Sequence, residues 1–179
     1  MKPIVCISGT SRPDNYTFRA LSVVADELRR LGAPVEIVDA RELVLSFPGQ
    51  PDTDDARHLQ ELIRVAGGVI MASPEYHGSF AAMTKLIIEN LGFPSALAGK
   101  PVALLGVAGG RIGAIKTLEQ LRGVFAHVGA IVIPGAVSIA GVRAVFEADG
   151  RVVEAGSEKA LLGLAGSMIN FMQDFVCPK

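Results

Sequence analysis

Short apolar runs recur along this chain, and segments with helical periodicity or loops separate them. The runs lack the polar alternation of a strand that has one face in water. Continuous apolar strands are instead typical of parallel sheets buried on both faces. Five such strands are expected, at residues 3–7, 35–38, 68–72, 102–107 and 130–133. This alternation restricts the chain to an α/β fold in which helices cover a parallel sheet.

Helices are expected between the strands, because apolar residues recur there at intervals of three and four positions. The first helix carries one apolar stripe, formed by Leu21, Val24, Ala25, Leu28 and Leu31. Further helices are expected from about residue 52 to 66, over 81–91, along a stripe from 115 to 128, and over 157–176. Residues 137–146 form a weaker extended region. Asp149-Gly150 then predicts a hairpin turn between residues 144–146 and 152–153.

The predicted element order indicates one domain over residues 1–179. Right-handed crossovers leave few topologies for five parallel strands that alternate with helices. One of the two common arrangements, the flavodoxin-like order 2-1-3-4-5, gives a three-layer sandwich around a five-stranded parallel sheet. In that order a ligand pocket opens where the first and third strands part, at the carboxyl edge of the sheet. The turns after those two strands should therefore line one site.

The composition argues against several classes of partner. The 17 Lys and Arg residues nearly balance the 18 Asp and Glu residues, which gives a formal net charge of -1. No basic stripe indicates nucleic acid, and no apolar stretch approaches the ~20 residues that span a bilayer. We expect no secretory signal, and Cys6 and Cys177 are too few for a disulfide framework or a zinc site. We therefore expect a cytoplasmic protein without a metal, in which Cys6 is a small buried hydrophobe.

The turn after the first strand, residues 9–17, is rich in groups that bind anions. It contains Thr10, Ser11, Arg12, Asn15, Tyr16 and Thr17. A helix that starts there adds unsatisfied N–H groups and partial positive charge, which suit a phosphate. Arg also binds phosphate oxygens through its forked guanidinium. The alternative is that Asn15 or Thr17 caps the helix while Arg12 is solvated.

Two other nucleotide-binding patterns fit less well. A Walker A loop requires Gly directly before Lys-[Ser/Thr], but Ile115 precedes Lys116-Thr117. Asp39 ends the second strand, as the ribose-binding acid of a dinucleotide fold does, yet the first turn lacks G-x-G-x-x-G. A mononucleotide phosphate held by hydroxyls is the better interpretation.

Two further turns follow buried strands. Residues 73–80 read Ser-Pro-Glu-Tyr-His-Gly-Ser-Phe and are expected to connect the third strand directly to a helix. Residues 106–113 contain four glycines, which let a backbone approach a flat ligand closely and present its N–H groups. The alternative for this second segment is a flexible turn that binds nothing.

Together these turns resemble the NADPH-dependent FMN reductase family of flavodoxin-like flavoproteins, which includes flavin, quinone, azo-dye and chromate reductases. The resemblance is carried by the pattern G-[ST]-x-R-x-x-[SN]-x-[TN], by Ser-Pro-Glu-Tyr-His-Gly-Ser-Phe, and by a Gly-Gly turn after the fourth strand. It extends over nearly the whole chain, including residues 146–151 before the last helix. The sequence departs from the family at Asn15 (often Ser), Thr17 (often Asn) and Glu89-Asn90 (often Asp-Trp). The last departure lies on a helix often used in oligomer contacts.

The resemblance implies a set of FMN contacts without a catalytic side chain. The phosphate would be held by Thr10, Ser11, Arg12, Asn15, Tyr16 and Thr17. The ribityl chain and isoalloxazine would be lined by Pro74, Glu75, Tyr76, His77 and Gly78, and the pyrimidine edge by backbone groups of Ala108, Gly109 and Gly110. N–H donors at that edge stabilise the negative charge of reduced flavin. Hydride transfer to flavin N5 needs no protein acid, so His77 is expected to bond backbone groups and Glu75 to orient its turn.

The activity that the resemblance implies is FMN-dependent NAD(P)H oxidoreduction. Hydride would pass from NADPH or NADH to FMN, and a quinone, azo compound, chromate or free flavin would then take the electrons in the same place. A homodimer or homotetramer is expected. The alternative is a flavodoxin-type electron carrier for protein partners, which the net charge of -1 disfavours because such carriers have acidic docking faces. A flavin-free α/β binding protein is a third hypothesis.

Overall fold

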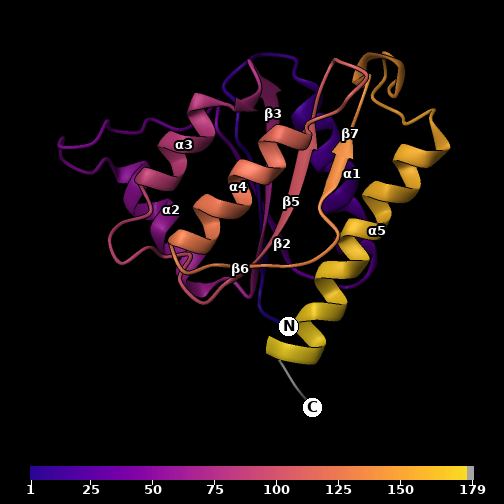
Figure 1. Cartoon of the computed structure of the whole chain (residues 1–179). Helices are drawn as coiled ribbons and strands as arrows, with labels where there is room; N and C mark the ends of the chain where they lie inside the picture. Colours follow the sequence, from indigo (N-terminus) through magenta and orange to yellow (C-terminus); the bar gives the residue numbers. More distant parts are fainter. Residues whose placement is uncertain (177–179) are drawn as a thin grey trace.

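The computed structural model describes residues 1–176, and Cys177 lies outside them. Its parallel sheet has the order β2-β1-β3-β5-β6, which confirms the predicted five-stranded order 2-1-3-4-5 (Figure 1). The five strands are β1 (Ile4–Ser8), β2 (Val35–Asp39), β3 (Gly68–Tyr76), β5 (Pro101–Val107) and β6 (Ile131–Val132). β1 pairs in parallel with both β2 and β3, and the strands β1 and β5 are buried along their whole length. This burial is why they read as unbroken apolar runs.

The sheet has two further short strands, of which the first was not expected and the second lies in the region predicted to be weakly extended. β4 (Ser79–Phe80) pairs antiparallel with β3, and β7 (Val137–Ile139) pairs in parallel with β5. β6 and β7 thus share one edge of β5, where a single strand at 130–133 was predicted. Pro134, which cannot donate to a ladder, and Gly135, with φ 84°, separate the two pieces. The weakly extended region also contains a 3₁₀ helix, η1 (Val142–Ala144), which was not predicted.

Helices cover both faces of the sheet, as a three-layer sandwich requires. They are α1 (Tyr16–Arg30), α2 (Asp54–Val65), α3 (Ala82–Glu89), α4 (Ile115–His127) and α5 (Ala155–Phe171), followed by the π-helical turn η2 (Met172–Val176). α1 and α5 pack on the face that contains Ile4 and Cys6. α2, α3 and α4 pack on the opposite face, with Val5 and Ile7. Successive residues of β1 therefore serve the two different cores.

The boundaries of the helices depend on their caps. α1 begins where Asn15 accepts a hydrogen bond from the N–H of Phe18 at 2.7 Å. α5 begins at Ala155, two residues before the predicted start, because the Glu154 carboxylate accepts hydrogen bonds from the N–H groups of Gly156 and Ser157. The predicted hairpin turn is confirmed by the antiparallel bridge between Phe146 and Val152.

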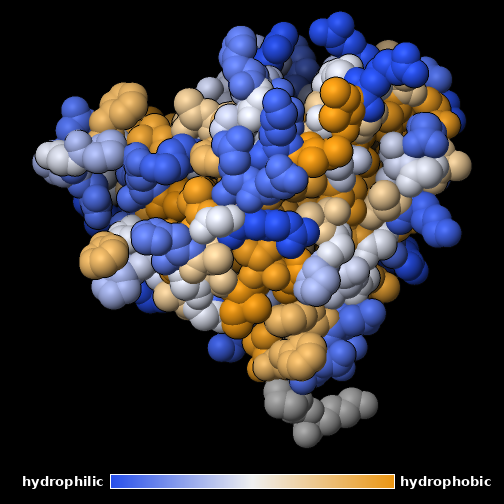
Figure 2. Space-filling view, viewed as in Figure 1, coloured by the Kyte–Doolittle hydropathy of each residue, from blue (hydrophilic) through white to orange (hydrophobic). Residues whose placement is uncertain are grey.

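The surface seen in Figure 2 has a polar end and a more hydrophobic region. Figure 2 shows polar side chains around the upper end of the molecule, where β3, β5 and β7 end, and hydrophobic ones lower down between α4 and α5. Cys6 lies in the core, and burial raises the pKa of its thiol to about 12. Within residues 1–176, no helix combines the length and the apolar character needed to cross a bilayer.

Candidate functional site

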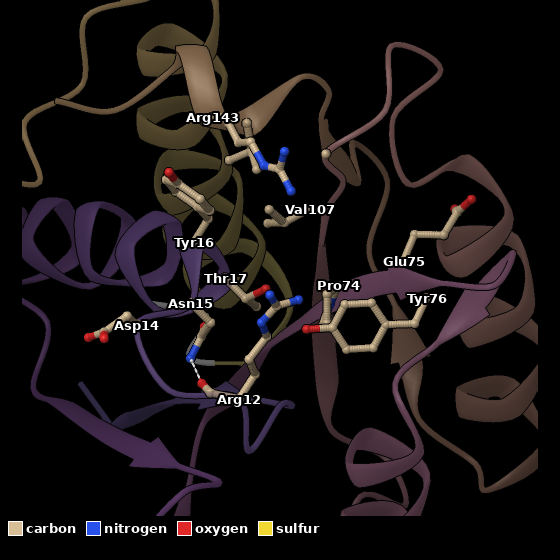
Figure 3. A pocket seen from close by; sticks show the side chains of 12 residues that line it. Arg12, Asp14, Asn15, Tyr16, Thr17, Pro74, Glu75, Tyr76, Val107 and Arg143 are labelled. Carbon is tan, nitrogen blue, oxygen red and sulfur yellow. Dashed lines mark hydrogen bonds between the residues drawn. The ribbon is translucent and has the colours of Figure 1, made fainter. Parts of the chain in front are cut away.

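A cavity of about 150 Å³ opens at the carboxyl edge of the sheet, where β1 and β3 part (Figure 3). Its walls come from four segments that are distant in sequence: the turn before α1, the end of β3, the end of β5, and η1. The lining residues are Arg12, Asp14, Asn15, Tyr16, Thr17, Pro74, Glu75, Tyr76, Val107, Gly109, Val142 and Arg143. This is the position at which open α/β sheets bind their ligands.

The first turn is held in shape by Asn15. Its amide donates to the carbonyl oxygen of Arg12 at 2.8 Å, and its carbonyl oxygen caps α1 (Figure 3). Both polar atoms of Asn15 thus serve the turn, as the alternative interpretation of this residue supposed. The Thr10 hydroxyl accepts from the N–H of Arg12 at 3.3 Å and lies 3.4 Å from the Tyr76 hydroxyl. The turn therefore directs the remaining N–H groups of the α1 N-terminus and the Arg12 guanidinium toward the cavity.

Buried hydroxyls join this turn to β3 and α3. Thr84, which is fully buried, donates to the carbonyl oxygen of Gly9 at 2.7 Å and lies 3.0 Å from the Ser73 hydroxyl. Ser73 in turn accepts from the N–H of Ala81 at 3.1 Å. A Cβ on Gly9 would lie 2.2 Å from Thr84 Oγ1, so only glycine fits there. These contacts fix the first turn relative to the strand that forms the opposite wall.

The segment 73–80 was predicted to connect a strand directly to a helix, and this prediction was wrong. β3 continues through Tyr76 and forms a hairpin with β4. His77 and Gly78 have φ 52° and 76°, and positive φ at both central residues is what a type I′ hairpin turn requires. The side chain of Gln120 on α4 donates to the Gly78 carbonyl oxygen at 3.0 Å and accepts from the Ser79 hydroxyl at 2.6 Å.

The Glu75 carboxylate does not face the cavity centre. It accepts a hydrogen bond from the N–H of Thr117 at 3.1 Å, in the first turn of α4, which has no side-chain cap of its own. Figure 3 shows this carboxylate directed away from the Arg12 and Tyr76 side chains. Glu75 therefore joins the hairpin to α4, and its geometry is that of an orienting residue.

The structure brings most, but not all, of the predicted contacts to the cavity. Eight of them line it: Arg12, Asn15, Tyr16, Thr17, Pro74, Glu75, Tyr76 and Gly109. Thr10 and Ser11 are not among the lining residues: the Thr10 hydroxyl lies 3.4 Å from the Tyr76 hydroxyl, and Ser11 is exposed. His77 and Gly78 occupy the tip of the hairpin, and Ala108 and Gly110 form backbone bonds with residues 139–142. An added Cβ at Gly109 or Gly110 would meet nothing within 4 Å, so the space beside this turn is open to a ligand.

Four lining residues were missed: Asp14, Val107, Val142 and Arg143. Arg143 matters most, because it brings a second guanidinium to the cavity. It lay in the region predicted to be weakly extended. One feature of the sequence could have predicted it. Arg143 follows a segment that joins the same sheet as a strand, and the carboxyl ends of parallel strands meet at one edge of the sheet.

Asp39 is not available to a ribose. Its carboxylate accepts from the backbone N–H of Arg41 at 3.0 Å and pairs with the guanidinium of the same residue. This agrees with the rejection of a dinucleotide fold. In the described residues, no three His, Cys, Asp or Glu side chains are grouped as potential metal ligands.

The chain is similar to flavin-dependent reductases. The model of the family described as NADPH-dependent FMN reductase matches residues 2–144. An NADPH azoreductase of Bacillus sp. (strain OY1-2) is 31% identical over 141 residues, 78% of each chain. An NAD(P)H-dependent FMN reductase of Pseudomonas aeruginosa is 30% identical over 163 residues, 84% of each chain. In fold, the flavoenzyme NAD(P)H:(acceptor) oxidoreductase FerB of Paracoccus denitrificans has a TM-score of 0.81 at 22% identity, over 97% of this chain and 98% of that one.

Proposed function

Because the chain belongs to the NADPH-dependent FMN reductase family and is an FMN-dependent NAD(P)H oxidoreductase, we propose how its cavity serves that reaction. The observation that carries the proposal is the convergence on one cavity of the α1 N-terminus, the Tyr76 hydroxyl and the Arg12 guanidinium, which has no salt bridge within residues 1–176. Free N–H donors, partial positive charge and Arg together suit a phosphate. The open space beside Gly109 and Gly110 suits a flat ring.

Each wall of the cavity has a distinct part in holding FMN. Thr10, Ser11, Arg12, Tyr16 and Thr17 hold the phosphate, and Asn15 shapes the turn that presents them. The ribityl chain and isoalloxazine lie along Pro74, Glu75 and Tyr76, with His77 and Gly78 as the outer rim of the hairpin. Backbone groups of Ala108, Gly109 and Gly110 face the pyrimidine edge.

Bound FMN supplies the redox chemistry, because it accepts hydride from NAD(P)H and returns the electrons to an acceptor. The protein contributes position and electrostatics. The backbone N–H groups of Gly109 and Gly110 favour negative charge at the ring edge, whereas the N–H of Ala108 already donates to the Ile139 carbonyl oxygen at 2.9 Å. No side chain is needed as an acid or base: the Glu75 carboxylate already accepts from Thr117, and His77 is exposed at the hairpin tip. Donor and acceptor then use the same open face in turn.

The acceptor is a small molecule of the quinone, azo, chromate or free-flavin class. The relatives named as azoreductase and FMN reductase support this range. Pockets that enclose a drug-sized ligand have about 300–1,000 Å³, and this cavity has about 150 Å³. The isoalloxazine would therefore be partly uncovered in one chain, which leaves room for an acceptor beside it.

We also propose that the chain forms a homodimer or homotetramer. The small cavity supports this, because a second copy would cover the exposed ring. So does an apolar groove between α3 and α4, lined by Lys85, Ile88, Glu89, Gly123, Val124, His127 and Val128. A second copy of this chain is the occupant that we assign to the groove.

Anaerobic stopped-flow absorbance tests the proposed reaction. FMN-loaded protein is mixed with NADPH and, separately, with NADH, and bleaching of the flavin band is followed. Fast bleaching is expected, and the faster donor is the physiological one. Tight FMN binding without bleaching by either donor would instead support an electron carrier. Failure to retain FMN at all would favour the flavin-free binding protein.

Replacing Arg12 with Ala tests the phosphate position. A charged hydrogen bond contributes about 1.5–3 kcal/mol, so FMN should bind roughly 10- to 100-fold more weakly. The measurement is flavin content after purification and Kd by fluorescence quenching. Arg122→Ala, an exposed α4 substitution outside the cavity, is the control and should keep full flavin content. Full occupancy in Arg12→Ala would contradict the assignment.

A further inference from the structure

Two guanidinium groups enter the same cavity from opposite sides. Arg12 comes from the turn after β1, and Arg143 comes from η1, which follows β7. Figure 3 shows both side chains directed into the space between Tyr16 and Tyr76. Like charges in one cavity raise each other's electrostatic energy unless an anion lies between them. The arrangement of the two guanidinium groups therefore favours binding of an anionic ligand.

No carboxylate of the described residues neutralises this pair. Within residues 1–176, six other arginines form salt bridges, whereas Arg12 and Arg143 form none. Two acidic residues line the cavity, but Glu75 accepts from the N–H of Thr117, and Figure 3 shows the Asp14 carboxylate turned away from both guanidinium groups. The positive charge of the cavity is thus left for a ligand.

The backbone around Arg143 is fixed to the glycine turn. The N–H of Gly141 donates to the carbonyl oxygen of Gly110 at 3.0 Å, and the N–H of Val142 donates to that of Ala108 at 3.1 Å. Gly141 has φ 55°, in the region that favours glycine, and Val142 is buried. η1 is therefore held against the site, and Arg143 is delivered to the cavity by a supported backbone.

We infer that Arg143 and Arg12 form a two-sided clamp on the flavin phosphate, and that Arg143 thereby makes the enzyme select FMN over riboflavin. The inference rests on the proposed function. A phosphate has oxygens enough for two forked guanidinium contacts. The α1 N-terminus, the phosphate site of the proposed function, lines the same small cavity as Arg143. This shared cavity favours the flavin phosphate over the phosphates of the nicotinamide donor.

The test compares two flavins that differ only in the phosphate. Apo-protein is titrated with FMN and with riboflavin, following quenching of flavin fluorescence, for the wild type, Arg143→Ala, Arg143→Lys and the control Arg122→Ala. Arg143→Ala should weaken FMN binding about tenfold or more and leave riboflavin binding unchanged. Arg143→Lys should be intermediate, because it keeps the charge and loses the fork. Arg122→Ala should match the wild type.

Three outcomes would overturn the clamp. An equal loss of FMN and riboflavin binding would give Arg143 a merely structural role. Unchanged FMN binding together with a fall in the NADPH-to-NADH ratio of kcat/KM would assign it to the donor. If the wild type binds no FMN, both the clamp and the proposed function are wrong. If the wild type binds FMN and only the Arg143 prediction fails, the clamp alone is wrong. Circular dichroism of each variant checks that the fold is retained.

Discussion

At the scale of single residues, two buried threonines have opposite surroundings. The Thr84 hydroxyl bonds the Gly9 carbonyl oxygen and contacts Ser73, whereas among residues 1–176 the equally buried Thr117 Oγ1 has no hydrogen-bond partner. Thr84→Val keeps the shape but leaves the Gly9 carbonyl unsatisfied, so the free energy of unfolding should fall by about 1–3 kcal/mol. Urea denaturation measures this. Thr84→Val should also weaken FMN binding, because the first turn loses its anchor.

Thr117→Val is the matched substitution. It removes a buried hydroxyl that has no partner, so stability should stay unchanged or rise by about 1 kcal/mol. If the two variants lose equal stability, the hydrogen bonds of Thr84 are not what holds the turn.

Much of the cavity follows from the sequence at this scale, because the predicted topology brings the turns after β1, β3 and β5 to one edge. Arg12, Tyr76 and Gly109 lie at the cavity for that reason. Arg143 was missed because its position depends on backbone bonds between Gly141 and Gly110 and between Val142 and Ala108. Such long-range bonds in irregular segments leave no periodic pattern in the sequence.

At the scale of elements, α5 depends on an acidic N-cap. Hydrogen bonds from Ser157 and from the Gly156 N–H lower the pKa of Glu154 below its usual value of 4.5. A carboxylate with a lowered folded-state pKa stabilises the fold above the unfolded-state value, and this stabilisation is lost as the pH falls through the folded-state value. The free energy of unfolding should therefore decline below pH 4.5 partly through Glu154.

Glu154→Gln tests this dependence. At neutral pH the variant should be less stable than the wild type, and the difference should disappear as the pH is lowered below 4.5. Urea unfolding between about pH 3 and pH 8, a range that includes the ordinary Glu pKa of about 4.3, provides the measurement. Glu36→Gln, at an exposed β2 position, is the control. A stability difference that does not vary with pH would show that ionisation of Glu154 does not contribute to the pH dependence of folding.

The element pattern was predictable where packing alone decides it. Helical stripes and buried strands gave the order of elements, but the extension of β3 was missed, because Pro within a run argues against a strand. The structure explains the exception. β1 stops pairing at Ala72, so on that side no strand requires the N–H donor that Pro74 lacks, while β5 pairs with β3 as far as Pro74. Caps likewise moved the start of α5, which periodicity does not reveal.

At the scale of the whole molecule, the proposed self-association uses the groove between α3 and α4. Val124 lies in this apolar groove, so Val124→Lys should place a charge in the proposed contact and shift the protein toward the monomer. Sedimentation or light scattering gives the mass. Val153→Lys, at an exposed valine outside the groove, should leave it unchanged. A Val124→Lys protein with the wild-type mass would rule out this groove as the interface.

The hairpin and α4 are held as one piece, and α4 also lines the groove. Glu75 bonds the first turn of α4, and Gln120 bonds the hairpin tip. A partner that packs against α4 would therefore also restrain the β3–β4 hairpin, which forms one wall of the proposed flavin site. By thermodynamic reciprocity, the factor by which assembly tightens flavin binding equals the factor by which flavin tightens assembly. For the proposed homo-oligomer, we therefore expect a dilute preparation to lose its yellow colour as it dissociates, and added FMN to reassemble it.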